Sequence, residues 1–168
     1  NAVENKVILN LDGIDELSDV DPIACELICF RLNPSIGKTD SETVSNILGG
    51  KDSKFGIDTN DILNAYKLAK DKGFKRFGIH CMTGSNIMDP SYWYTLVCTI
   101  YQVVKKLFDD GIRLEFMNLG GGIGIQYQPD KQPIDIELIA KNIRQAISDS
   151  KILFEIDVKS SRIFKSIN

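Results

Sequence analysis

The sequence lacks any apolar run approaching the ~20 residues that a helix needs to cross a bilayer. Its start does not show the pattern of a signal peptide. It also lacks a basic excess, because 20 Lys and Arg face 23 Asp and Glu, for a formal net charge of -3. We therefore expect neither a nucleic-acid nor a membrane partner. The chain begins at Asn1 rather than Met, so we expect a trimmed, cleaved or incomplete chain.

Histidine and metal-binding cysteine patterns are scarce as well. The sequence has one histidine and four cysteines, at Cys25, Cys29, Cys81 and Cys98. None of the cysteines forms a C-x-x-C pair, and no histidine stands near Cys25 and Cys29 to complete a zinc set. We predict no metal site. We interpret the four cysteines as reduced thiols that pack as small apolar groups in a cytoplasmic protein.

What the sequence does contain is an alternation of short apolar runs and amphipathic segments. Its 168 residues suffice for one domain with a hydrophobic core. We predict strands at residues 6–11, 26–32, 76–81, 114–119 and 151–156, and helices at 15–20, 61–72, 90–109 and 135–148. Near-continuous apolar strands are typical of a parallel α/β sheet covered by helices. An open doubly wound sheet and a (β/α)8 barrel both fit this order.

A glycine run is the strongest functional signal. Directly after the strand at 114–119 the chain reads Gly120, Gly121, Gly122, Ile123, Gly124. Bare backbone approaches an anion closely, and successive N–H groups can point at it. Because ligands of α/β folds lie beyond the carboxyl ends of the strands, we predict a phosphate site here. The alternatives are a turn that serves only chain reversal and a dinucleotide site, although the G-x-G-x-x-G order is missing.

Other polar residues follow the predicted strands, and each has two interpretations. His80 either serves a ligand near the phosphate loop or is a core histidine satisfied by backbone. Ser85 and Asn86 either reach the ligand or cap the following helix. Glu155, at the end of the last predicted strand, needs a partner for its carboxylate. That partner is either a ring nitrogen of a cofactor or a lysine or arginine of a neighbouring strand.

The first two predicted strands also end in charged residues. Asp12 and Glu16 are interpreted as acids at the start of a short helix, where they favour the helix dipole. Arg31 is interpreted as a structural ion-pair partner.

Five stretches occur in the order and spacing of a known family. They are residues 12–17 (D-G-I-D-E-L), 30–34 (F-R-L-N-P), 53–57 (S-K-F-G-I), 77–86 (F-G-I-H-C-M-T-G-S-N) and 117–125 (M-N-L-G-G-G-I-G-I). Together they resemble the fold-type III pyridoxal-phosphate-dependent decarboxylases, with an alanine racemase-like barrel, and most closely the diaminopimelate decarboxylases. Tyr127 and Pro129 continue the likeness, which extends from residue 6 to about residue 156.

The resemblance implies the barrel rather than the open sheet. Residues 1–157 would form about the last five β/α units of a (β/α)8 TIM-type barrel that binds pyridoxal 5'-phosphate, and residues 158–168 a tail unlike the family. The earlier strands, one with the lysine that holds the cofactor, and the later β-domain would lie outside this chain. The implied reaction is decarboxylation of meso-diaminopimelate to L-lysine, in a homodimer when full length. Related arginine, ornithine or carboxynorspermidine decarboxylases, or a non-catalytic truncated homologue, are the alternatives.

The resemblance also implies roles for individual residues. His80 and Glu155 would be catalytic, and Glu155 would keep the pyridine nitrogen protonated. The residues that would bind the cofactor are Ser85, Gly120, Gly121, Gly122, Gly124 and Glu155.

Two departures separate this chain from the family pattern. Met82 stands where the family has a ring-stacking histidine, so either its thioether packs against the ring or His80 serves instead. After Glu155 the chain reads I-D-V rather than P-G-R. No arginine is therefore assigned to the phosphate, because the spacing of Arg162 does not fit.

Overall fold

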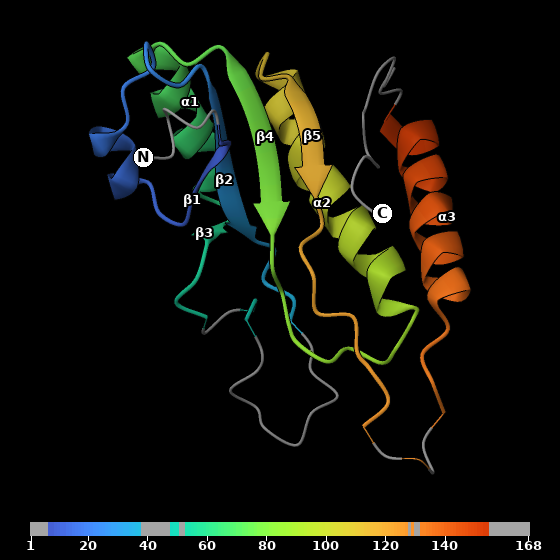
Figure 1. Cartoon of the computed structure of the whole chain (residues 1–168). Coiled ribbons are helices and arrows are strands. Elements are labelled where there is room, and N and C mark those ends of the chain that lie inside the picture. The colour runs from blue at the N-terminus through green and yellow to red at the C-terminus, as the bar shows by residue number, and fades with distance from the viewer. Residues whose placement is uncertain (1–6, 38–47, 51–52, 128, 130–131, 155–168) are drawn as a thin grey trace.

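The computed structural model describes residues 7–37, 48–50, 53–127, 129 and 132–154. Its elements are β1 (Leu9–Leu11), the 3-10 helix η1 (Asp15–Asp19), β2 (Leu27–Asn33), β3 (Ile57–Asp58), α1 (Ile62–Lys72), β4 (Arg76–Cys81), α2 (Tyr92–Asp109), β5 (Leu114–Asn118) and α3 (Ile136–Phe154) (Figure 1). Of the helices in these ranges, none is sufficiently long and apolar to span a membrane.

The strands form one parallel sheet in the order β1-β2-β4-β5, with β3 beside β2. In the register of this sheet, Arg31 of β2 is opposite His80 of β4, which in turn is opposite Asn118 of β5. Because every pairing is parallel, the carboxyl ends of the strands meet at one edge (Figure 1). Polar residues far apart in the sequence are thereby brought to the same place.

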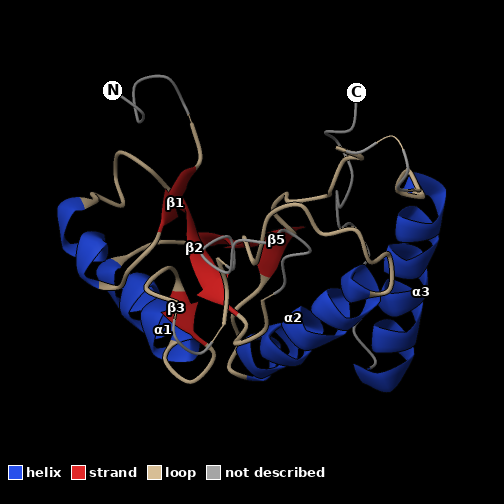
Figure 2. Cartoon of the chain, turned by 90° about the horizontal axis from the view of Figure 1, so that it is seen from below, coloured by secondary structure: helices blue, strands red, loops and turns tan. Residues whose placement is uncertain are grey.

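The helices lie on one face of this sheet. Both views show α1 and α2 behind the same face, and α3 packs against α2 rather than against the sheet (Figure 2). In the part of the chain that the structure describes, no helix covers the other face. A doubly wound sheet has helices on both faces, whereas barrel strands carry helices only on the outside. The layering therefore agrees with a section of a (β/α) barrel whose interior is the uncovered face.

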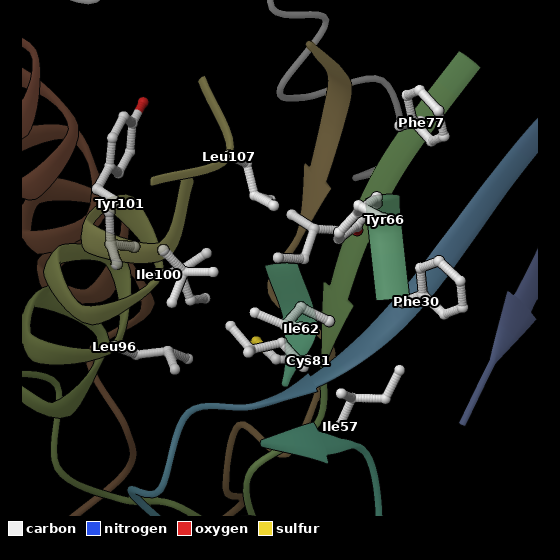
Figure 3. Packing of buried hydrophobic residues seen from close by; sticks show 14 of the residues in the cluster. Phe30, Ile57, Ile62, Tyr66, Phe77, Cys81, Leu96, Ile100, Tyr101 and Leu107 are labelled. Atoms are coloured by element: carbon white, nitrogen blue, oxygen red, sulfur yellow. The ribbon is translucent and has the colours of Figure 1, made fainter. Parts of the chain in front are cut away.

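The core fills the space between the sheet and the helices. Tyr66 of α1 packs edge-on against Phe30 and Phe77, with ring centroids 5.1 and 5.8 Å apart (Figure 3). Its hydroxyl donates a hydrogen bond to the carbonyl of Gly78. Because buried polar groups need partners, this bond lets a tyrosine occupy a fully buried position. Helix α1 ends at Gly73, whose φ of 112° is the left-handed cap that glycine favours.

Four of the five predicted strands are confirmed, and the strand predicted at 151–156 is wrong. Residues 151–154 continue α3, and residues 155–156 lie outside the described residues. A short apolar run does not distinguish a strand from a buried helix. The buried positions Ile139, Ile143, Ala146 and Ser150 keep helical spacing up to this run, so the helix continues through it. The sheet also contains β3, which was not predicted because its two residues are too few to show a periodic pattern.

The four cysteines are free thiols, as predicted. Cys29 and Cys81 are buried, and burial raises the pKa of each thiol to about 12. These two thiols are therefore neutral packing groups rather than nucleophiles.

Candidate functional site

A row of polar side chains crosses the sheet at its carboxyl edge. Arg31, His80 and Asn118 are direct neighbours in the register of β2, β4 and β5. Residues that are neighbours across parallel strands point to the same side, and successive residues of a strand alternate between the two faces. Because Phe30 packs on Tyr66 of α1, Arg31 points away from the helices, and His80 and Asn118 lie with it on the uncovered face. Asp12, directly after β1, extends the row through an ion pair with Arg31. This row is the floor of the candidate site.

The guanidinium of Arg31 joins three segments of the chain. Its Nη1 donates to Asp12 Oδ1 at 2.9 Å, and its Nη2 donates to the carbonyls of Met82 at 3.2 Å and Leu48 at 3.5 Å. The side chain of Arg31 is only 14% exposed, against 39% for that of Asp12. The prediction that Arg31 is an ion-pair partner is confirmed. The prediction missed that the pair lies within the site.

Asp12 also fixes the segment that precedes β3. Its Oδ2 accepts a hydrogen bond from the N–H of Gly56 at 3.1 Å, and the ring of Phe55 lies 4.9 Å from the Arg31 guanidinium. The start of η1 is held separately, because Glu16 Oε2 accepts from the N–H of Asp12 at 2.7 Å. The helix-start interpretation therefore holds for Glu16, whereas the carboxylate of Asp12 serves the row.

His80 is half-buried in the middle of the row. Burial lowers its pKa below the ordinary value, the positive charge of Arg31 lowers it further, and Asp12 opposes this effect. Its Nδ1 is buried, and no partner for it is found among the described residues. The interpretation of His80 as a core histidine satisfied by backbone is therefore wrong. Burial and Arg31 thus both favour the neutral ring.

The glycine loop follows β5 and lies against the segment after β4. Gly120 has φ +75°, and its N–H donates to Asn118 Oδ1 at 2.9 Å. A Cβ on Gly120 would lie 2.1 Å from the carbonyl oxygen of Cys81, and a Cβ on Gly122, with φ +96°, would lie 2.1 Å from that of Gly84. Both positions therefore require glycine for the fold itself. Asn118 was missed in the sequence, where nothing indicates its bond to the loop.

The middle glycine differs from its neighbours. A Cβ on Gly121 would meet nothing within 4 Å, and its N–H points at the thioether of Met82, 3.3 Å away. A thioether is a weak acceptor. In the described part of the chain, the N–H groups of Gly122 and Ile123 have no hydrogen-bond partner. Successive N–H groups beside open space suit a phosphate, so the loop fits the phosphate end of pyridoxal phosphate.

Gly124, at the far end of the loop, makes a backbone hydrogen bond within the fold. Gly124 is buried, its N–H donates to the carbonyl of Ile87 at 3.0 Å, and the N–H of Ile87 donates to Gly122 at 2.8 Å. Any contribution of Gly124 to a phosphate would therefore be through loop shape rather than through its own N–H. The position of Gly124 beside the phosphate remains a prediction.

Ser85 and Asn86 lie in the segment that supports the loop. Asn86 Oδ1 accepts a hydrogen bond from the N–H of Ile125 at 3.2 Å. Helix α2 begins at Tyr92 and its start is held by Asp89, whose Oδ1 accepts from the N–H of Ser91 at 2.9 Å. The helix-capping interpretation of Ser85 and Asn86 is therefore wrong. Ser85 is half-buried, and its role toward the cofactor stays a prediction.

A hollow of about 570 Å³ opens on the other side of Asp12, away from the glycine loop. It lies between the ends of β1 and β3, and residues that line it include Asp12, Glu16, Lys54, Gly56 and Asp58. The glycine loop follows β5 at the carboxyl edge of the sheet. Glu155 and Arg162 lie outside the described residues, and the role of Glu155 at the ring nitrogen stays a prediction.

Residues 1–160 match the family described as pyridoxal-dependent decarboxylase, pyridoxal binding domain. The diaminopimelate decarboxylase of Methanothermobacter thermautotrophicus is 35% identical over 151 residues, which are 88% of this chain and 35% of that protein. The chain thus spans about a third of the length of that curated relative.

Solved structures agree with this match. The diaminopimelate decarboxylase from M. jannaschii in co-complex with L-lysine superposes with a TM-score of 0.72 and 28% identity, over 92% of this chain and 37% of that one. The enzyme from Helicobacter pylori complexed with L-lysine gives 0.72 and 27%, over 84% and 37%. The predicted likeness and the barrel architecture are confirmed. That the chain holds about the last five β/α units, within residues 1–157, stays a prediction.

Proposed function

The chain belongs to the pyridoxal-dependent decarboxylases, as a pyridoxal binding domain, and on that premise we propose that it forms the cofactor-binding part of an enzyme that converts meso-diaminopimelate to L-lysine. The observation that carries the proposal is the glycine loop. It follows β5, next to the row of Asp12, Arg31 and His80, and the N–H groups of Gly122 and Ile123 in it have no partner among the described residues. Because the chain covers about a third of its curated relatives, the activity belongs to a longer protein.

The residues of this chain bind and orient the cofactor in the proposed enzyme. Bound pyridoxal phosphate would take up the electron pair left when carbon dioxide departs. The N–H groups of Gly121 and Gly122 would hold the phosphate, Ser85 would support the cofactor, and Glu155 would keep the ring nitrogen protonated. His80 faces the same uncovered side of the sheet and would act on the ring or the substrate. The donor set at the loop consists of neutral N–H groups, which suit a phosphate.

The substrate is proposed from the relatives. The names of several relatives at 31–35% identity specify diaminopimelate, and two solved structures hold L-lysine, its decarboxylation product. Lysine/ornithine and arginine decarboxylases are also structurally similar, but at 18–21% identity they show the fold alone. An arginine, ornithine or carboxynorspermidine substrate is the alternative.

A cytoplasmic location and a homodimer complete the proposal. The four free cysteines support a reducing compartment. The dimer rests on the family resemblance.

The test is an assay of the full reading frame that contains this chain. We expect release of carbon dioxide from meso-diaminopimelate, dependent on pyridoxal phosphate, and none from L-ornithine, L-arginine or carboxynorspermidine. Release from one of the latter alone contradicts the proposed substrate. The isolated chain, treated with pyridoxal phosphate and borohydride, should give no defined lysine adduct. A stable adduct on a single lysine would show that the cofactor-holding lysine lies in this chain after all.

One observation favours a second function, a non-catalytic homologue that binds phosphate compounds. Met82 stands where the resemblance implies a histidine, and its thioether lies against the N–H of Gly121. A full-length protein that binds pyridoxal phosphate but releases no carbon dioxide from any of the four amino acids would establish this function.

A further inference from the structure

The two nitrogens of the His80 imidazole have different surroundings. Nδ1 is buried, and no hydrogen-bond partner for it is found among the described residues. The residue as a whole is only half-buried, and Nε2 is not among the buried side-chain atoms without a partner. His80 is on the uncovered face of the sheet, so Nε2 is the nitrogen that meets solvent or a ligand.

Burial and the positive charge of Arg31 favour the neutral ring. The described charged groups facing it are Arg31 on β2 and Asp12 at the end of β1, and these two are paired to each other at 2.9 Å. Burial and Arg31 both lower the pKa of His80, and only Asp12 raises it. The neighbour on β5, Asn118, carries no charge. The imidazole therefore carries one proton, on one of two nitrogens.

The surroundings decide which nitrogen carries that proton. A proton on Nδ1 would be a buried donor without an acceptor, and such orphaned donors are rare and costly in proteins. A proton on Nε2 keeps its hydrogen bond to solvent and leaves only a lone pair in the dry position. Of the two tautomers, the one protonated on Nε2 is the more stable.

We propose that His80 is held in the Nε2–H tautomer and donates that hydrogen bond to an anionic oxygen on the ring of the bound cofactor. This inference rests on the proposed function, because it takes the ligand on the glycine loop to be pyridoxal phosphate. His80 then orients the ring as a donor.

The register of the sheet distinguishes the ring from the phosphate as the acceptor. His80 is opposite Asn118, and Asn118 Oδ1 holds the N–H of Gly120 at 2.9 Å. The loop thus begins two residues beyond the level of His80, a span of at most about 7 Å. An ion held on the loop therefore lies beyond the level of His80. A ring joined to that phosphate through one carbon extends back toward the row.

The test uses the fact that His80 is the only histidine of the chain. In a ¹⁵N-labelled sample of the chain, one imidazole gives one pair of nitrogen signals. At neutral pH we expect the signal pattern of a protonated Nε2 and an unprotonated Nδ1. Addition of pyridoxal phosphate should shift the Nε2 signal, and inorganic phosphate alone should not. A proton on Nδ1, or a charged ring at pH 7, overturns the inference.

The amide signals of Gly121 and Gly122 separate this inference from the proposed function. If pyridoxal phosphate shifts these amides and leaves His80 unchanged, the inference is wrong and the proposed function stands. If it shifts neither, both are wrong for this chain. If inorganic phosphate shifts His80 as much as pyridoxal phosphate does, the ring oxygen is not the acceptor, and the inference is again wrong.

Two matched variants test the direction of the hydrogen bond. The amide nitrogen of His80→Gln lies near the place of Nε2, and that of His80→Asn lies near the place of Nδ1. We expect the dissociation constant of pyridoxal phosphate to stay within about 3-fold in His80→Gln and to rise about 10-fold or more in His80→Asn, as for loss of a hydrogen bond to a charged group. Circular dichroism checks that both variants fold. Equal losses would contradict the proposal, and the tautomer measured on the unmodified chain tests it even if a variant unfolds.

Discussion

Substitution of Gly122 by alanine tests the geometry of the glycine loop without any ligand. The added Cβ would lie 2.1 Å from the carbonyl oxygen of Gly84 and 3.0 Å from its carbonyl carbon. Ordinary contacts of a Cβ begin at 3.4 Å, so the two backbones must separate by about 1.3 Å (3.4 less 2.1). Such a shift also strains the nearby 2.8 Å bond from the N–H of Ile87 to the carbonyl of Gly122.

Two effects of Gly122→Ala lower the free energy of unfolding. A non-glycine residue at φ +96° carries about 1–3 kcal/mol of backbone strain. Overpacking against rigid backbone adds about 1–3 kcal/mol. The free energy of unfolding should therefore fall by about 2–6 kcal/mol, a large share of the about 5–15 kcal/mol that holds a typical domain together.

Urea unfolding followed by the fluorescence of Trp93 measures this change. Trp93 is the single tryptophan of the chain and is buried in α2, so its emission reports loss of the core. With a slope of about 2 kcal/mol per M, the midpoint should fall by about 1–3 M. Gly121→Ala is the matched control, because its Cβ meets nothing within 4 Å, and its midpoint should change little. Equal midpoints for the two variants would refute the loop geometry.

Three further predictions concern the row and the layer beneath it. Gly78→Ala places a Cβ 2.1 Å from Cζ of Phe116, so it should lower the free energy of unfolding, measured in urea, by about 1–3 kcal/mol. In a Phe116→Ala background the same substitution should cost less, because the ring that it contacts is gone. Asp12→Asn removes the ion-pair partner of Arg31 and should lower the free energy of unfolding by about 1–2 kcal/mol, a value discounted because the Asp12 side chain is 39% exposed. A ¹⁵N titration should show that the pKa of His80 falls further in this variant, because Asp12 raises it. An unchanged pKa would contradict the effect assigned to Asp12. Because folding lowers the pKa of His80, the unfolded chain binds the proton more tightly, so stability is complete above about pH 6.5 and falls as the pH drops toward the folded pKa. Urea midpoints at pH 7.5 and 5.5 should show this fall, and a similar fall in His80→Gln would assign it to other groups.

Much of the fold follows from local pattern. The runs at 26–32, 76–81 and 114–119 are strands within a residue or so of the prediction, because parallel strands buried on both faces are continuously apolar. The same feature caused the error at residues 151–154, since an apolar run that extends a helix shows no alternation to reveal it. The choice of barrel over open sheet depends on which face each helix covers, and no local pattern encodes that.

The sequence indicated individual residues of the candidate site but not the contacts between them. A glycine run after a strand indicates an anion loop, but only the structure shows that Gly120 and Gly122 serve close backbone contact while Gly121 faces open space. Arg31 and Asp12 are visible at strand ends, yet their pairing depends on the register of β1 and β2. Whether Nδ1 of His80 has a partner is decided by the residues that pack around it, and the sequence does not indicate these residues.

The bonds of Arg31 have a consequence for how the protein folds. They connect this side chain to Leu48, Asp12 and Met82, which are separated from Arg31 by 17, 19 and 51 positions in the sequence. Contacts between residues so distant in sequence form only after the intervening loops have closed, and such contacts slow folding. The polar row at the carboxyl edge of the sheet therefore does not form as a local motif. It arises in the same cooperative step that assembles the sheet, so gaining the ability to bind and becoming folded are a single event.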